Sequence, residues 1–129
     1  NMEDYIQQQQ CRGREREAAL SYFDQELRRI LDSEPGQAVW HGTQRDLVEM
    51  IALVAARRTI CDERGVPLSM NRLGERAFRA IGRTMPHHLS KVVYRIRNRM
   101  DHSLGIVERW LRLNHQSTDN SIYPSYHNL

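Results

Sequence analysis

Four arginines recur in one stretch of the chain at steps of four, three and four residues. At about 100° of rotation per residue, these steps place all four within about 60° of arc on one side of a helix. A guanidinium group can bind a phosphate, or the edge of guanine, through two parallel hydrogen bonds. The pattern therefore predicts a surface that binds a nucleic-acid backbone. We call it the arginine ridge: Arg72, Arg76, Arg79 and Arg83.

A second set of hydrogen-bonding side chains follows in the next predicted helix, which we expect to begin near Pro86 and end at residues 101–103. The set lies opposite an apolar stripe formed by Leu89, Val93 and Ile96. Side chains of these types reach phosphates and the edges of bases in DNA. We call this set the groove face: His87, Lys91, Tyr94, Arg95 and Asn98.

Charge is distributed unevenly along the chain. Residues 1–56 carry six basic and ten acidic side chains, a net charge of −4. Residues 57–99 carry eleven basic and three acidic side chains, a net charge of +8, and residues 100–129 contribute −1. The basic block is therefore much stronger than the overall net charge of +3 suggests. A solvated surface, or a partner for the acidic N-terminal helix, is the alternative interpretation of such a block.

The elements that must position these side chains centre on an apolar helix expected at residues 43–58. Its apolar residues cover most of its circumference, so other elements must cover it from several sides. Thr43 and Asp46 have the spacing of a helix cap, and Trp40 could pack at its start. The arginine ridge lies on a helix that begins after Ser69 and ends at Gly82. Two short helices that follow a buried one are typical of a helix-turn-helix domain.

Further helices are expected on both sides of this unit. One helical segment is expected at residues 2–11, with a break at Gly13. A second helix is expected at residues 15–32, where the apolar residues recur more regularly at helical spacing. Residues 66–68 are too short for more than a stub of strand, and a last helix is expected at residues 104–114. The apolar face of the helix at 15–32 could pack on the central helix, or instead form a dimer seam or a docking surface. It consists of Leu20, Phe23, Leu27, Ile30 and Leu31.

The predicted fold class is therefore all-α, with a domain similar to a helix-turn-helix or winged helix and an extra N-terminal helix. We divide the chain into an N-terminal helical segment (1–36), the predicted DNA-binding domain (37–114) and a polar tail (115–129). The tail is expected to be mobile unless Tyr123 and Tyr126 dock on the domain.

Several other classes of function lack a sequence pattern. The histidines and Cys11 and Cys61 do not have the spacing of a metal site or a disulfide framework. No nucleotide-binding loop or nucleophile elbow occurs, so we expect no cofactor, no small-molecule substrate and no enzyme activity. The chain has no predicted membrane span or signal peptide, and we expect it to be cytoplasmic.

Several segments together resemble the C-terminal region of the RteC family. They are WHGT at residues 40–43, DLVEMIAL at 46–53, the helix start LS at 68–69 with Phe78, and YRIRNR at 94–99. A last helix rich in Trp and Leu follows in both. RteC proteins regulate the excision and transfer of conjugative transposons that carry tetracycline resistance.

The resemblance covers about residues 38–113 and implies a mostly helical DNA-binding domain of winged-helix type that regulates transcription. No strand–turn–strand pattern follows Arg99, so we expect the wing to be small, absent or replaced by a turn at residues 101–105. The resemblance does not identify residues that contact bases. The assignment of the ridge to the DNA backbone and of the groove face to the major groove therefore rests on helix geometry alone.

The sequence thus predicts a regulator that binds double-stranded DNA and, on a palindromic target, a second copy of itself. The alternative is a helical protein-interaction or dimerisation module that does not bind DNA.

Overall fold

The computed structural model describes residues 1–99 and 105–116, and every regular element within these ranges is a helix. The all-α class predicted from the sequence is confirmed for this part of the chain. An isolated β-bridge between Cys61 and Pro67 is the one strand-like pairing in it. In chain order the helices are α1 (Met2–Leu31), α2 (Gln44–Arg57), α3 (Met70–Ile81), α4 (Leu89–Arg97) and α5 (Ile106–Gln116).

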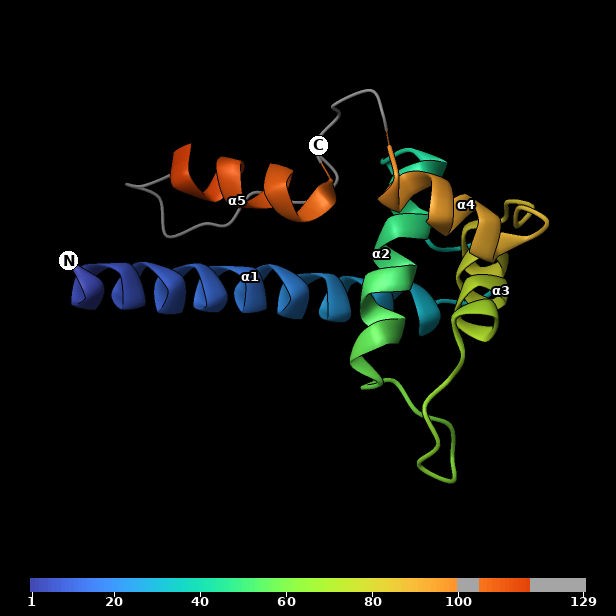
Figure 1. Ribbon diagram of the computed structural model, residues 1–129. Coiled ribbons are helices and arrows are strands. Elements are labelled where there is room, and N and C mark those ends of the chain that lie inside the picture. Colours follow the sequence, from blue (N-terminus) through green and yellow to red (C-terminus); the bar gives the residue numbers. More distant parts are fainter. Residues whose placement is uncertain (100–104, 117–129) are drawn as a thin grey trace.

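The helix α2 is the element on which the others pack. α5 lies antiparallel to α1 on one side of it, α3 and α4 lie on the other, and the end of α1 reaches past α2 to α3 (Figure 1). Its start has the predicted cap, because the Thr43 hydroxyl accepts a hydrogen bond of 3.0 Å from the Asp46 N–H. Trp40 is buried at this end, and its indole N–H donates to the Thr43 carbonyl over 2.9 Å. Local sequence signals therefore suffice to start the central helix.

The helix α1 differs from its prediction because it is continuous through Gly13 and spans 30 residues. Glycine costs only about 1 kcal/mol relative to alanine inside a helix, and Arg12, Arg14 and Glu15 around it are good helix formers. The apolar face predicted for this helix is buried within the chain. Phe23, for example, is fully inaccessible, and α1 packs on α2, α3 and α5. This face is therefore covered without a second copy.

The helix α4 is shorter than predicted at both ends. It begins at Leu89 rather than near Pro86, after His88, whose φ of 57° is left-handed. The chain turns here because α3 comes close: a Cβ added at Gly74 would lie 2.9 Å from side-chain atoms of both Leu89 and Met85. The helix ends at Arg97.

Side chains account for the end of α4. The Asn98 amide donates to the Tyr94 carbonyl over 2.9 Å, and the Arg99 Nε donates to the Ile96 carbonyl over 2.7 Å. These bonds satisfy carbonyl groups that a longer helix would otherwise use. The sequence predicted that this helix ends at residues 101–103. That end was wrong, because Asn98 and Arg99 already lie outside α4.

The helix α5 begins two residues later than expected, after Gly105, and ends at Gln116. An ion pair between the Asp46 carboxylate on α2 and the Arg109 guanidinium joins it to the central helix. Trp110 of α5 packs against Tyr22 of α1, with 5.8 Å between ring centroids. The start predicted at Leu104, and Tyr123 and Tyr126 of the tail, lie outside the described residues.

A compact hairpin joins α2 to α3 and projects from the body of the molecule (Figure 1). The Leu68 N–H donates to the Ile60 carbonyl, and the Asp62 N–H donates to the Val66 carbonyl, each over 2.8 Å. This short pairing is the stub of strand that the sequence predicted at residues 66–68. The turn expected in place of a wing, at residues 101–105, lies mostly outside the described residues.

Candidate nucleic-acid interface

All four side chains of the arginine ridge are exposed, but only Arg72, Arg76 and Arg79 lie on α3; Arg83 follows the end of the helix, so the prediction of four arginines on one helix was wrong at this residue. The Ser69 hydroxyl accepts from the Arg72 N–H over 3.1 Å and starts the helix, and Gly82 ends it with a φ of 70°. The Arg72 guanidinium lies 3.3 Å from the Glu75 carboxylate, an exposed pair one turn apart. The Arg83 Nη2 donates to the Trp40 carbonyl over 3.3 Å. The four ridge side chains are thus all exposed, and two of them already bind other residues of the chain: Arg72 binds Glu75, and Arg83 binds Trp40.

The ridge lies on the flank of α3 that faces away from α4. Along this flank, the Gly36 N–H donates to the Arg79 carbonyl over 3.1 Å, and Arg83 binds Trp40. α4 approaches the other flank, at Gly74. At 100° per residue, Arg79 lies about 140° around the helix from Gly74, whereas Arg83 lies beyond the helix. The ridge and the groove face are therefore separate surfaces.

Four of the five groove-face residues share the outer side of α4, opposite the buried residues Leu89, Val93 and Ile96. Tyr94 is the most prominent, with 68% of its surface exposed. The four residues are Lys91, Tyr94, Arg95 and Asn98, the last at the helix cap. His87 is also exposed, but it lies in the connection before the helix rather than on the helix.

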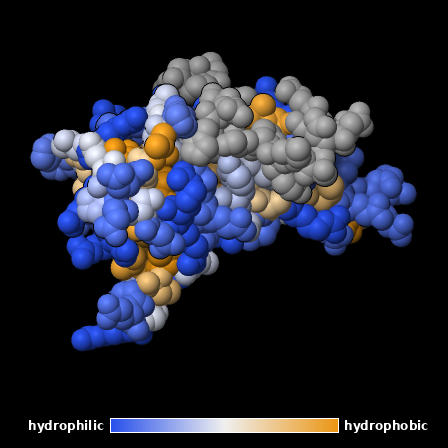
Figure 2. All heavy atoms as spheres, turned by 180° about the vertical axis from the view of Figure 1, so that it is seen from behind, coloured by the Kyte–Doolittle hydropathy of each residue, from blue (hydrophilic) through white to orange (hydrophobic). Residues whose placement is uncertain are grey.

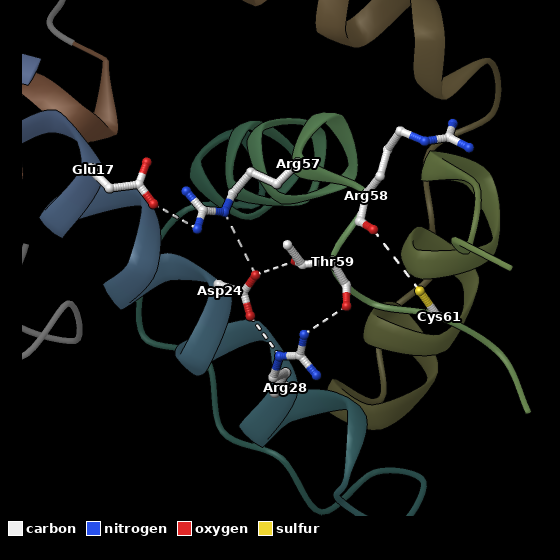
Figure 3. A network of polar contacts seen from close by, with 7 residues as sticks. All are labelled: Glu17, Asp24, Arg28, Arg57, Arg58, Thr59 and Cys61. Atoms are coloured by element: carbon white, nitrogen blue, oxygen red, sulfur yellow. Dashed lines mark hydrogen bonds and ion pairs between the residues drawn. The ribbon is translucent and has the colours of Figure 1, made fainter. Parts of the chain in front are cut away.

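Other arginines of the basic block are neutralised by long-range ion pairs. Arg57, with 22% of its side chain exposed, lies 2.8 Å from the Glu17 carboxylate and 3.7 Å from that of Asp24 (Figure 3). Arg99, with 15% exposed, lies 3.1 Å from the Glu49 carboxylate. These arginines stabilise the packing of the helices. The sequence did not reveal this division of the block, because the partners lie on other elements.

Asp24 is the centre of the network at the end of α2. Burial raises the pKa of its carboxyl group, but hydrogen bonds from Thr59 and Arg28 and the charges of Arg28 and Arg57 outweigh burial, so its pKa is lowered. Arg28 also donates to the Thr59 carbonyl over 2.9 Å. The first residue of the hairpin is therefore tied to α1 (Figure 3).

Arg58 and Arg97 are two exposed cations that the predicted site left out. Arg58 follows α2 with a left-handed φ of 57°, and its side chain points away from the Asp24 network (Figure 3). Arg97 lies near the end of α4, and both residues line one groove beside α3. Their charges were visible in the sequence. Their convergence on one groove was not, because it depends on how α2 and α4 pack.

The surface shows where polar residues gather. In Figure 2 the hairpin projects at the lower left with a hydrophilic tip, and apolar patches on this face are small and interrupted. Among the described residues, no group of three or more His, Cys, Asp or Glu side chains is placed to hold a metal ion. No helix in the described part combines the length and apolar character needed to span a bilayer.

Comparisons of the chain with protein-family models, with curated proteins and with solved structures found no match.

Proposed function

We propose that the chain binds double-stranded DNA, with the outer side of α4 in the major groove and the arginine ridge on the phosphate backbone. The observation that carries the proposal is the division of the arginines into two groups. Arg57 and Arg99 are paired with carboxylates in the packing between elements. Within the described residues, Arg79, Lys91 and Arg95 have no carboxylate within ion-pairing distance, although all three are exposed.

Exposed cations without partners are suited to a polyanion. Surface positions could have carried acidic residues as easily, yet the outer side of α4 has none. Each phosphate bound by an arginine or lysine releases condensed counterions, which favours binding at moderate salt. The charge pattern therefore supports a nucleic acid as the partner.

The shape of the α4 region suits duplex DNA. The major groove is wide enough to admit an α-helix, and α4 is held by its buried side on α2. The order of a supporting helix, a second helix and an exposed third helix matches a helix-turn-helix. The connection at residues 82–88 is longer than the three or four residues typical of that motif. The angle between α3 and α4 can therefore differ from the angle between the two helices of a helix-turn-helix.

The biological role is the further part of the proposal. The resemblance to the RteC family supports a regulator of transcription that controls the excision or transfer of a conjugative transposon. It rests on residues 40–43, which precede α2, on residues 46–53 within α2, on residues 68–69 and Phe78 at and within α3, on residues 94–99 at the end of α4, and on the last helix.

The proposal is tested by fluorescence anisotropy with a random-sequence duplex at salt concentrations between about 50 and 200 mM. The test variant replaces the four ridge arginines with alanine. A charge-matched control replaces four exposed arginines of α1 and α5: Arg12, Arg14, Arg16 and Arg112.

We expect the wild type to bind tightly and to lose about a thousandfold in affinity over this salt range, as for six or more phosphate contacts. The ridge variant should bind much more weakly than the control. Absence of binding by the wild type at the lowest salt would contradict the proposal.

A protein-interaction module is the second candidate function. Met2, Tyr5 and Ile6 form an exposed apolar stripe on one side of α1, in its first two turns. Such a stripe could contact another protein. Failure of DNA binding would make this stripe the next surface to test, by light scattering of the wild type and of a Tyr5→Ser/Ile6→Ser variant.

A further inference from the structure

A groove of about 610 Å³ lies between the end of α2, the start of α3 and one side of α4. Its lining is largely small or apolar and includes Ala55, Pro67 and Val93. Arg58, which follows α2, and Arg97 of α4 both line it. Side chains 39 positions apart in the sequence therefore bring two positive charges to one groove.

Both arginines are free to bind a ligand. Each is exposed, and within the described residues neither has a carboxylate within ion-pairing distance. The contrast with Arg57 is direct, because that neighbour is turned toward Glu17 and Asp24 (Figure 3). A polyanion can offer one phosphate group to each of these two guanidinium groups.

The hairpin fixes the backbone that follows Arg58. Thr59, next to Arg58, donates through its hydroxyl to the Asp24 carboxylate, and Ile60 is buried. At the tip, the Asp62 carboxylate accepts from the N–H groups of Arg64 and Val66 over 2.8 and 3.0 Å. The backbone that leads away from Arg58 is thus fixed at its base and at its turn, so this backbone needs little ordering on binding.

The groove adjoins the proposed DNA-binding side of α4. Ser90 and Tyr94 line it, and the same two residues border the outer surface that carries Lys91 and Arg95. A helix in the major groove has a phosphate backbone along each side. Arg58 and Arg97, which lie beside the outer side of α4, are therefore better placed for a phosphate of the same duplex than for a separate small anion.

We propose that Arg58 and Arg97 bind the phosphate backbone beside α4, as a contact separate from the arginine ridge; this inference rests on the proposed DNA binding. Guanidinium groups suit this role because they can bind phosphate through paired hydrogen bonds. The contact adds the end of α2 to the elements that bind the phosphate backbone, in addition to the arginine ridge. Arg64 lies at the hairpin tip beside Glu63, whose opposite charge weakens its contribution.

The test compares an Arg58→Ala/Arg97→Ala variant with an Arg14→Ala/Arg16→Ala control of the same net charge. The salt slope, the slope of the logarithm of the binding constant against the logarithm of salt concentration, is measured on a random duplex. Each lost phosphate contact should make the slope shallower by about 0.9, so the test variant should differ by about 1.8. The control should keep nearly the wild-type slope.

A second variant, Arg58→Lys/Arg97→Lys, separates charge from guanidinium geometry and should recover most of the salt slope. Thermal unfolding followed by circular dichroism checks that all variants are folded. If the wild type binds with a steep slope and the alanine variant behaves like the control, the contact is overturned while DNA binding stands. If the wild type does not bind, both proposals are overturned.

Discussion

Arg57 and Arg58 are neighbours in the chain, yet their guanidinium groups leave the end of α2 in opposite directions (Figure 3). Arg57 is helical and reaches the carboxylates of Glu17 and Asp24. Arg58 adopts a left-handed backbone, with φ 57° and ψ 33°, which turns its side chain toward the groove beside α3. One backbone change thus separates a cation that stabilises the fold from a cation available to a ligand.

Arg95→Ala and Arg79→Ala should have different effects on DNA binding. We expect loss of Arg95, on the outer side of α4, to weaken binding to a specific site by about 1–3 kcal/mol and binding to random duplex less. Loss of Arg79 should weaken both equally and reduce the salt slope by about 1. Competition anisotropy against a duplex selected from a random pool measures both. If the Arg95 variant loses as much affinity for random duplex as for the specific site, the proposed placement of α4 in the major groove is contradicted.

Asp24→Asn should destabilise the fold by about 2 kcal/mol at pH 7, because it removes a charge that accepts hydrogen bonds from Arg28 and Thr59. The pKa of Asp24 is lowered from 3.8 in the folded chain. Its stabilisation is therefore complete above about pH 5 and is lost progressively as the pH falls through the lowered pKa of the folded chain. Urea unfolding at pH 7 and pH 3 measures the difference between the two proteins.

That difference should be smaller at pH 3 than at pH 7, because the carboxyl group of the unfolded wild-type chain gains its proton near pH 4, before that of the folded chain, whose pKa is lowered. Glu17→Gln is the control, because its carboxylate is exposed and its loss should have a much smaller effect at either pH. A difference between Asp24→Asn and wild type that does not shrink on acidification would refute the role of this charge.

Arg58→Gly should increase stability while it weakens DNA binding. The left-handed conformation costs an L-residue about 1 kcal/mol that glycine does not incur, although glycine also makes the unfolded chain more flexible. We therefore expect a gain of about 0.5 kcal/mol in the free energy of unfolding, together with a shallower salt slope. Arg58→Ala should weaken binding to the same extent without the gain. Chemical denaturation and anisotropy on the same preparations distinguish these outcomes.

Gly42→Ala and Gly13→Ala should have opposite effects on stability. A Cβ at Gly42 would lie 2.8 Å from the buried ring of Trp40, which has little room to move, and we expect a loss of about 1–3 kcal/mol. Gly13 has no atom within 4 Å of the added Cβ and sits inside α1, so alanine should stabilise by about 0.5–1 kcal/mol. Thermal melts of the two variants give the signs. A stabilised Gly42 variant would show that Trp40 can shift.

Local signals accounted for much of the helix pattern. As predicted, α3 begins after Ser69 and ends at Gly82, because a cap hydroxyl and a left-handed glycine act within one turn of the helix. The break at Gly13 was wrong because one glycine is a small local cost that the strong helix formers around it exceed. The late start of α4 depends on the approach of Leu89 to Gly74, a contact that no local pattern reports.

The sequence by itself determined that the chain is helical, which faces of the helices are apolar, and that positive charge concentrates between residues 57 and 99. Those properties depend on residues within a few turns of one another. Only the tertiary structure decided which cations remain available. Arg57 is neutralised by Asp24, 33 positions away, whereas Arg58 and Arg97 meet at one groove. Charge is a property of single residues, but pairing depends on distances set by the packing of separate helices.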